Sequence, residues 1–167
     1  VGKFIEIEGE KYYQIQNYDD MPDFFMNIVS DSNHWMFISS NGSLTAGRKN
    51  RDNALFPYYT VDKIHDYKNI TGSKTYILVE KEGKTFLWEP FTDDSKNFYK
   101  ITRNLYKSNY GNKLIFEEVN HDFGLSFRYG WYNSEKFGFV KKSCVINNNK
   151  TAINIEVLDG IQNILPY

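Results

Sequence analysis

The chain has 167 residues, enough for a single hydrophobic core, and its 13 Tyr, 13 Phe and 3 Trp favour β-sheet because aromatic side chains fit a pleated, half-buried surface. Its 20 basic and 21 acidic residues nearly cancel, so nothing attracts phosphate backbones or anionic lipid over long distances. We therefore expect no nucleic acid and no membrane partner, and no apolar run is long enough to span a bilayer.

Strand-like runs separated by turn signals follow one another through the first half of the chain. Asn41-Gly42 stands between two of these runs and is the strongest short hairpin signal present. Gly9 and Gly83 provide the turn residue for two further hairpins. The expected hairpins pair residues 3–8 with 11–16, 34–40 with 43–48, and 75–80 with 85–88.

The clearest strand lies at residues 125–132, where side chains of two kinds alternate. Leu125, Phe127, Tyr129 and Trp131 point one way, which predicts one buried face. Asn- and Gly-containing breaks around this strand predict a meander of antiparallel strands. The other strands expected in this half cover residues 98–106, 113–119, 137–146 and 151–158.

Helix is expected at only two places, neither long enough to build a layer. One is residues 20–29, with Asp20 as cap and Pro22 in the first turn, and the other is residues 60–67. No internal repeat and no Pro-, Gly- or Ser-rich linker divides the sequence. We therefore predict one all-β domain over residues 1–167, an antiparallel two-sheet sandwich with one or two short helical turns.

The sequence contains no complete catalytic set. His34, His65 and His121 are scattered over three segments without zinc-like spacing, so we expect no metal site, and no cofactor fingerprint is present. Adjacent carboxylates such as Glu117-Glu118 should point to opposite faces of a strand and not converge on one bond. A carboxylate pair assembled from distant residues stays open. Cys144 is expected to face the core rather than to act as an activated thiol.

Several aromatic residues are candidates for a platform on which sugar rings stack. The alternation around Trp131 places that residue in the core between two sheets. For Tyr129 and Tyr132 both interpretations stay open, and these two are the candidate sugar-stacking residues. The wider group consists of Trp35, Trp88, Trp131, Tyr129 and Tyr132.

The polar stretch 39–53 is the most unusual part of the sequence. Apolar segments border it on both sides, and it presents arginine and asparagine side chains, which is typical of an interaction loop. As structure alone it would be a hairpin followed by a solvated connection, and both interpretations stay open. The candidate residues for a sugar site or subunit contact are Arg48, Asn50, Arg51 and Asp52.

Three segments in this order resemble a known family. They are Phe37-Ile38-Ser39-Ser40-Asn41-Gly42-Ser43 leading into residues 48–59, residues 75–79 with Thr85-Phe86-Leu87-Trp88-Glu89-Pro90, and residues 110–140. Together they resemble the N-terminal β-sandwich domain of cellobiose phosphorylase and related glycoside phosphorylases. That family has an I-S-x-x-G-G hairpin, an Arg-containing loop before an apolar-Pro-Tyr segment, and Trp-Ser-Pro. Ser43 and Glu89 depart from its pattern.

The resemblance implies a galactose-mutarotase-like super-sandwich fold and a supporting role. In that family the catalytic acid and the phosphate-binding residues lie in a following (α/α) barrel, so no catalytic residue is carried over to this chain. The expected partners are a downstream barrel of the same polypeptide and other subunits of a homo-oligomer. The loop with Arg48, Asn50, Arg51 and Asp52 is expected near the rim of the sugar site. The apolar end, from Ile161 onward, agrees with a chain that continues.

Two alternative functions remain open from the sequence. One is an independent carbohydrate-binding module, and the other is a structural or subunit-contact domain without a ligand. The compartment is open as well. A cytoplasmic location is favoured because no signal segment is present, although a chain that starts at Val1 looks truncated.

Overall fold

The structure is a computed structural model that describes residues 2–166, and antiparallel strands dominate it. The largest sheet has six strands in the order β1 (Gly2–Ile7), β2 (Glu10–Gln16), β8 (Ile101–Ser108), β9 (Lys113–Asn120), β10 (Leu125–Ser134) and β11 (Gly138–Asn147). One three-stranded sheet consists of β3 (Phe25–Ile28), β4 (His34–Ser39) and β5 (Leu44–Arg48). The other consists of β12 (Ile155–Gln162), β6 (Gly72–Lys81) and β7 (Lys84–Trp88).

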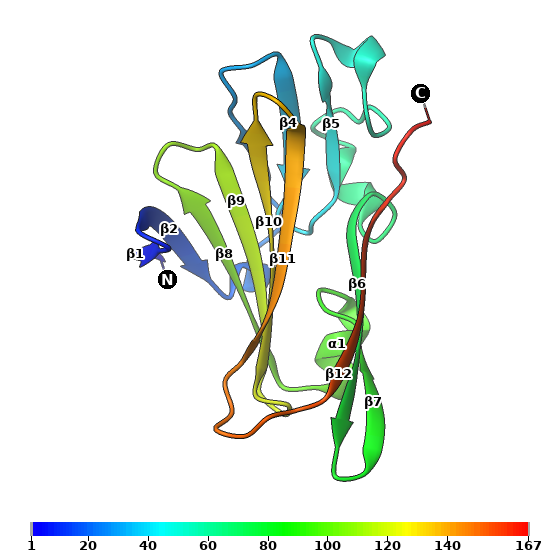
Figure 1. Ribbon diagram of the computed structural model, residues 1–167. Helices are drawn as coiled ribbons and strands as arrows, with labels where there is room; N and C mark the ends of the chain where they lie inside the picture. Colours follow the sequence, from blue (N-terminus) through cyan, green and yellow to red (C-terminus); the bar gives the residue numbers. More distant parts are fainter. Residues whose placement is uncertain (1, 167) are drawn as a thin grey trace.

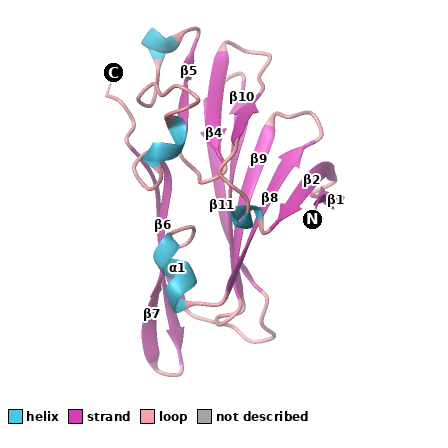
Figure 2. Cartoon of the chain, turned by 180° about the vertical axis from the view of Figure 1, so that it is seen from behind, coloured by secondary structure: helices cyan, strands magenta, loops and turns pink. Residues whose placement is uncertain are grey.

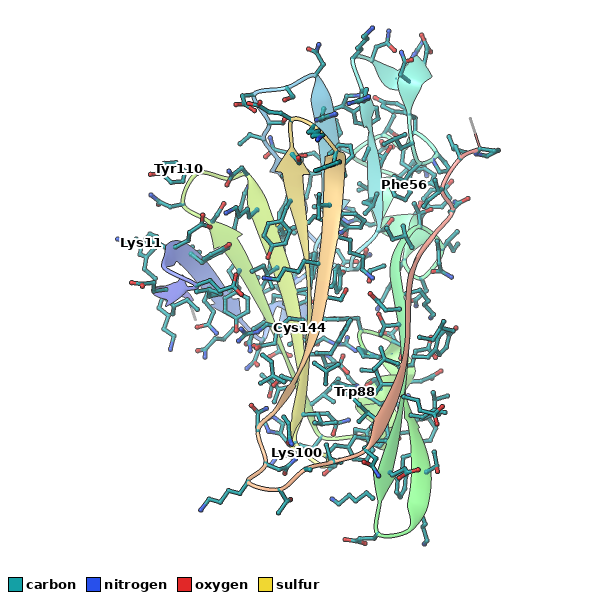
Figure 3. All side chains as sticks on the ribbon, in the orientation of Figure 1. Lys11, Phe56, Trp88, Lys100, Tyr110 and Cys144 are labelled. Atoms are coloured by element: carbon teal, nitrogen blue, oxygen red, sulfur yellow. The ribbon has the colours of Figure 1, made fainter. Side chains whose placement is uncertain are left out.

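The predicted antiparallel β sandwich is confirmed, with one difference in the second layer. The six-stranded sheet forms one layer, and the two smaller sheets lie opposite it (Figure 1 and Figure 2). Strands from all three sheets share one hydrophobic core, to which Ile38 of β4, Trp88 of β7 and Phe116 of β9 each contribute a fully buried side chain. Figure 3 shows Trp88 between the layers. The second layer therefore consists of two short sheets, where a single sheet was expected.

The three expected hairpins all form. Their closing pairs are Ile7 with Glu10, Ile38 with Leu44, and Lys81 with Lys84. Gly42 in the central hairpin has φ of +92°, which a residue with a side chain adopts only with strain. The alternation at 125–132 is confirmed as well, because its apolar set is at most 3% exposed.

The short helical elements differ in part from the prediction. A 3-10 turn at Ile64–Tyr67 lies inside the expected segment 60–67, but the expected helix over 20–29 is wrong. A 3-10 turn ends at Asp20, and Phe25–Ile28 forms β3, because this segment pairs with β4 and buries alternate side chains. One unexpected helix, α1 (Asp93–Phe98), begins where the Thr92 hydroxyl accepts a hydrogen bond from the Ser95 amide.

Within the described residues, no helix has the length and apolar character needed to cross a bilayer.

Candidate functional site

The predicted interaction loop follows β5, and its own side chains hold it in shape. The Asn50 side-chain oxygen accepts hydrogen bonds from the Asp52 amide at 3.2 Å and from the Asn53 side chain at 2.8 Å, which caps the 3-10 turn Arg51–Asn53. Arg51 and Asp52 are exposed and 3.8 Å apart, so water screens their attraction. Asn50 therefore shapes the loop, whereas Arg51 and Asp52 face solvent.

Arg48 is anchored by a buried histidine. Its Nε donates a hydrogen bond to Nε2 of His34 at 2.8 Å, and His34 is only 8% exposed. Burial and then the adjacent Arg48 charge lower the pKa of His34, so at neutral pH the ring is uncharged and accepts this bond. Among residues 2–166, no carboxylate lies within 4 Å of the Arg48 guanidinium. Its two terminal nitrogens form no side-chain hydrogen bond within these described residues.

A cavity of about 600 Å³ opens beside Arg48. The backbone amide of Leu165 donates to the Leu55 carbonyl at 2.9 Å, which brings the end of the described chain against the loop. The cavity wall thus combines cationic and apolar groups. Its lining residues are Arg48, Lys49, Asp52, Asn53, Ala54, Leu55, Leu165 and Pro166. Two of the four predicted loop residues, Arg48 and Asp52, therefore meet at one cavity.

Tyr129 does not offer a ring for sugar stacking, and this prediction is wrong. The side chain is 3% exposed and lies parallel to Phe116, with ring centroids 4.9 Å apart and planes inclined by 10°. Burial raises the pKa of its hydroxyl. Tyr129 belongs to the same inward set as Phe127 and Trp131, so the strand alternation already contained the signal against it.

Tyr132 lies on the outer face of the six-stranded sheet and is half-buried. It packs against a small second cluster that contains Tyr12 and Ile115. Its ring covers Gly130 so closely that a Cβ there would lie 2.7 Å from Tyr132 Cε2. The Tyr132 ring therefore packs in this outer cluster, and its role in sugar binding stays a prediction.

The adjacent glutamates lie on opposite faces of β9, as expected. Glu118 points inward and is fully buried, whereas Glu117 points to the outer face and is 4% exposed. Glu117 accepts hydrogen bonds from Arg128 at 2.6 Å and Asn104 at 2.7 Å, and the Tyr106 hydroxyl also donates to it. The outer-face carboxylate is therefore engaged within the sheet.

The Glu118 carboxylate is satisfied by four donors. One oxygen accepts from Trp88 Nε1 and Ser95 Oγ, each at 2.8 Å. The other accepts from the Phe91 amide at 2.7 Å and Arg103 Nε at 2.8 Å. Trp88 belongs to β7, Ser95 to α1 and Arg103 to β8, and Phe91 lies in the turn between β7 and α1, so Glu118 joins the two layers and the helix.

The remaining candidate groups are separated from one another. His65 shares a hydrogen bond with Ser39, and His121 shares one with Thr102. Throughout residues 2–166, no three metal-binding side chains gather in one place. Cys144 does not face the core as expected. It pairs with Arg128 in the register of β10 and β11, so it lies on the outer face and is exposed.

An aromatic row on the β3–β4–β5 sheet was largely missed by the sequence reasoning. We use this name for Phe25, Phe37, Trp35 and Tyr58, whose neighbouring ring centroids are 5.4, 5.8 and 5.9 Å apart. Trp35 alone was among the aromatic candidates. The available signal was that residues 35–38 are apolar at both odd and even positions, so apolar side chains point to both faces of this strand.

No protein-family model matches this sequence, and the search of curated proteins found no match.

Proposed function

We propose that this chain is a non-catalytic β-sandwich domain of a larger carbohydrate-active enzyme and supports a following (α/α) barrel. The segment order that resembles glycoside phosphorylases motivates the class. The observation that carries the proposal is Arg48, which a buried, neutral His34 orients while its terminal nitrogens, unpaired within residues 2–166, lie beside a cavity. An arginine fork held in this way suits the carboxylate or phosphate of another domain or substrate.

The position and the hydrogen bonds of Glu117 and Glu118 support a non-catalytic role for this domain. Glycoside cleavage needs two carboxyl groups that flank one bond. Glu117 and Glu118 lie on opposite faces of β9, and each accepts several hydrogen bonds from other groups of the domain. Freeing either group would leave its donors unpaired, so both act as part of the framework.

The full-length gene product and one charge variant test the proposal. The full-length protein should contain a helical domain after residue 167 and cleave oligosaccharides, with or without phosphate, whereas residues 1–167 alone should not. Arg48→Gln should lower the activity of the full-length enzyme. Lys100→Gln, which removes an exposed charge elsewhere, should not. Cleavage by the isolated chain, or a gene product without a helical domain, would refute the proposal.

A subunit-contact role is the second candidate, and a specific patch favours it. On the outer face of the β12–β6–β7 sheet, Leu78 lies opposite Leu87 and Tyr76 lies opposite Leu158. These four side chains are 36–69% exposed. A cluster of this kind is typical of a surface covered by another domain or subunit. Leu87→Glu should shift the full-length protein to a lower mass in sedimentation velocity if this patch joins subunits.

A further inference from the structure

The aromatic row is built on the outer face of a sheet whose inner face belongs to the core. In β4, Met36 and Ile38 are fully buried, while the alternate residues Trp35 and Phe37 remain partly exposed on the other side. Phe25 of β3 continues the row, and Tyr58, which is 49% exposed, ends it. Phe25 and Trp35 are each inclined by 32° to Phe37, so neighbouring rings of the row are tilted toward one another by the same moderate angle.

Contacts within the domain hold the Trp35 ring of the row in place without a ligand. Trp35 lies so close to Gly47 of β5 that a Cβ on this glycine would be 2.6 Å from Trp35 Cζ2. Trp35 Nε1 donates to the backbone carbonyl of Asn50 at 3.3 Å. The strand backbone and the capped loop therefore fix the indole ring, and little side-chain freedom is left to lose on binding.

Polar groups lie beside the row next to Phe37 and next to Trp35. Asn27 pairs with Phe37 in the register of β3 and β4, so it shares the outer face, and its exposed side-chain amide has no hydrogen-bond partner within the described chain. The loop whose Asn50 carbonyl holds Trp35 presents the exposed side chains of Arg51 and Asp52. A row of aromatic rings beside hydrogen-bonding groups matches a pyranose, which has apolar C–H faces and hydroxyl groups around its rim.

We propose that the aromatic row is a saccharide-binding platform for a chain of pyranose units. Neighbouring sugar rings stack on Phe37 and Trp35, Tyr58 contacts the end of the chain, and Asn27 with the Arg51–Asp52 pair bonds the hydroxyl groups. This inference rests on the proposed function for its carbohydrate setting. It moves the sugar contact from Tyr129, which is buried, to another sheet.

Binding of defined oligosaccharides tests the platform. Residues 1–167 and the full-length protein are titrated calorimetrically with hexaoses of β-1,4-glucose, β-1,4-xylose, β-1,4-mannose, β-1,3-glucose and α-1,4-glucose. At least one hexaose should bind both proteins. Tyr58→Ala and Phe37→Ala should weaken that binding roughly tenfold or more, which equals about 1.4 kcal/mol. Trp35→Phe, which retains an aromatic ring, should weaken binding less than Phe37→Ala.

Tyr110→Ala is the matched control. Tyr110 is 84% exposed at the turn between β8 and β9 and is not a member of the row, so its loss should leave affinity unchanged. Equal losses in Tyr110→Ala and Tyr58→Ala, or no binding of any hexaose, would overturn the platform. Self-association that Tyr58→Ala abolishes would instead make the row an interface between two copies.

The two proposals fail separately in these experiments. An active full-length enzyme with a helical domain, in which no hexaose binds this sandwich, leaves the proposed function intact and removes the platform. Saccharide binding by residues 1–167 in a gene product without a helical domain leaves the platform intact and removes the supporting role.

Discussion

Replacing Glu118 with Gln should destabilise the sandwich strongly while leaving its shape almost unchanged. Both side chains have nearly the same volume, so no cavity forms. The carboxylate now accepts four hydrogen bonds, two on each oxygen. In the variant an amide nitrogen, which donates, replaces one of these oxygens and faces two other donors. Arg103, which is 4% exposed, also loses its buried counter-charge, and among the described residues only the Asp19 carboxylate, at 3.6 Å, remains as its ion-pair partner.

The size of the effect follows from this loss. Removing one partner of a buried ion pair costs about 3–5 kcal/mol because the other charge stays buried without compensation. A domain of this kind has a free energy of unfolding of about 5–15 kcal/mol, so the variant should lose a large share of it. For 150–250 residues each kcal/mol shifts Tm by about 2–4 °C, which gives a drop of roughly 6–20 °C.

Urea unfolding followed by tryptophan fluorescence measures this loss, because Trp88 donates directly to Glu118. Glu135→Gln is the matched control. Glu135 is exposed in the turn after β10, and its replacement should change the free energy of unfolding by no more than about 0.5 kcal/mol. If Glu118→Gln also stays within about 1 kcal/mol of the wild type, the network around Glu118 does not join the layers as we argue.

Three further predictions concern the loop, the core and the dependence on pH. Gly47→Ala should cost roughly 1–3 kcal/mol of unfolding free energy because its Cβ would lie 2.6 Å from the Asn53 carbonyl oxygen, whereas Gly160→Ala, which meets nothing within 4 Å, should be neutral in the same urea assay. Burial raises the pKa of Tyr129, so its hydroxyl should stay protonated around pH 10, where exposed tyrosines ionise. Tyr129→Phe should therefore leave the absorbance rise of tyrosine ionisation unchanged, and a smaller rise in the variant would mean that the Tyr129 hydroxyl is accessible. Because the pKa of His34 is lowered in the folded protein, its contribution to stability is complete above about pH 6.5 and is lost as the pH falls through the folded-state pKa. Between pH 7 and 5 the wild type should therefore lose more unfolding free energy than His34→Gln. Equal losses would contradict a lowered pKa for His34.

Much of the fold could be predicted because the relevant signals are local. Asn41-Gly42 places a turn, and the alternation at 125–132 marks a strand with one buried face. The error over residues 20–29 has a tertiary cause. Asp20 and Pro22 do resemble a helix start, but Phe25–Ile28 gains more from pairing with β4 and burying Met26 and Ile28 in the core.

The site was predictable only in part, because its contacts join residues that are separated in the sequence. The sequence singled out Arg48 as a polar residue in an unusual loop, but not the histidine that orients it, because His34 and Arg48 meet only when β4 pairs with β5. The aromatic candidates show most clearly that sequence alone does not reveal which side chains are exposed. Tyr129 and Trp35 both stand in alternating aromatic stretches, yet one is buried and the other is partly exposed.

The amino-acid sequence by itself determined the strands, the hairpins and their antiparallel class, since these depend on side-chain periodicity and turn chemistry within a few residues. Only the tertiary structure decided which face of each strand is covered. Tyr129 is buried because the two small sheets close over its side of β10, and the aromatic row faces outward because Met36 and Ile38 already fill the core side of β4. A strand with apolar residues on both faces cannot reveal which face another layer covers.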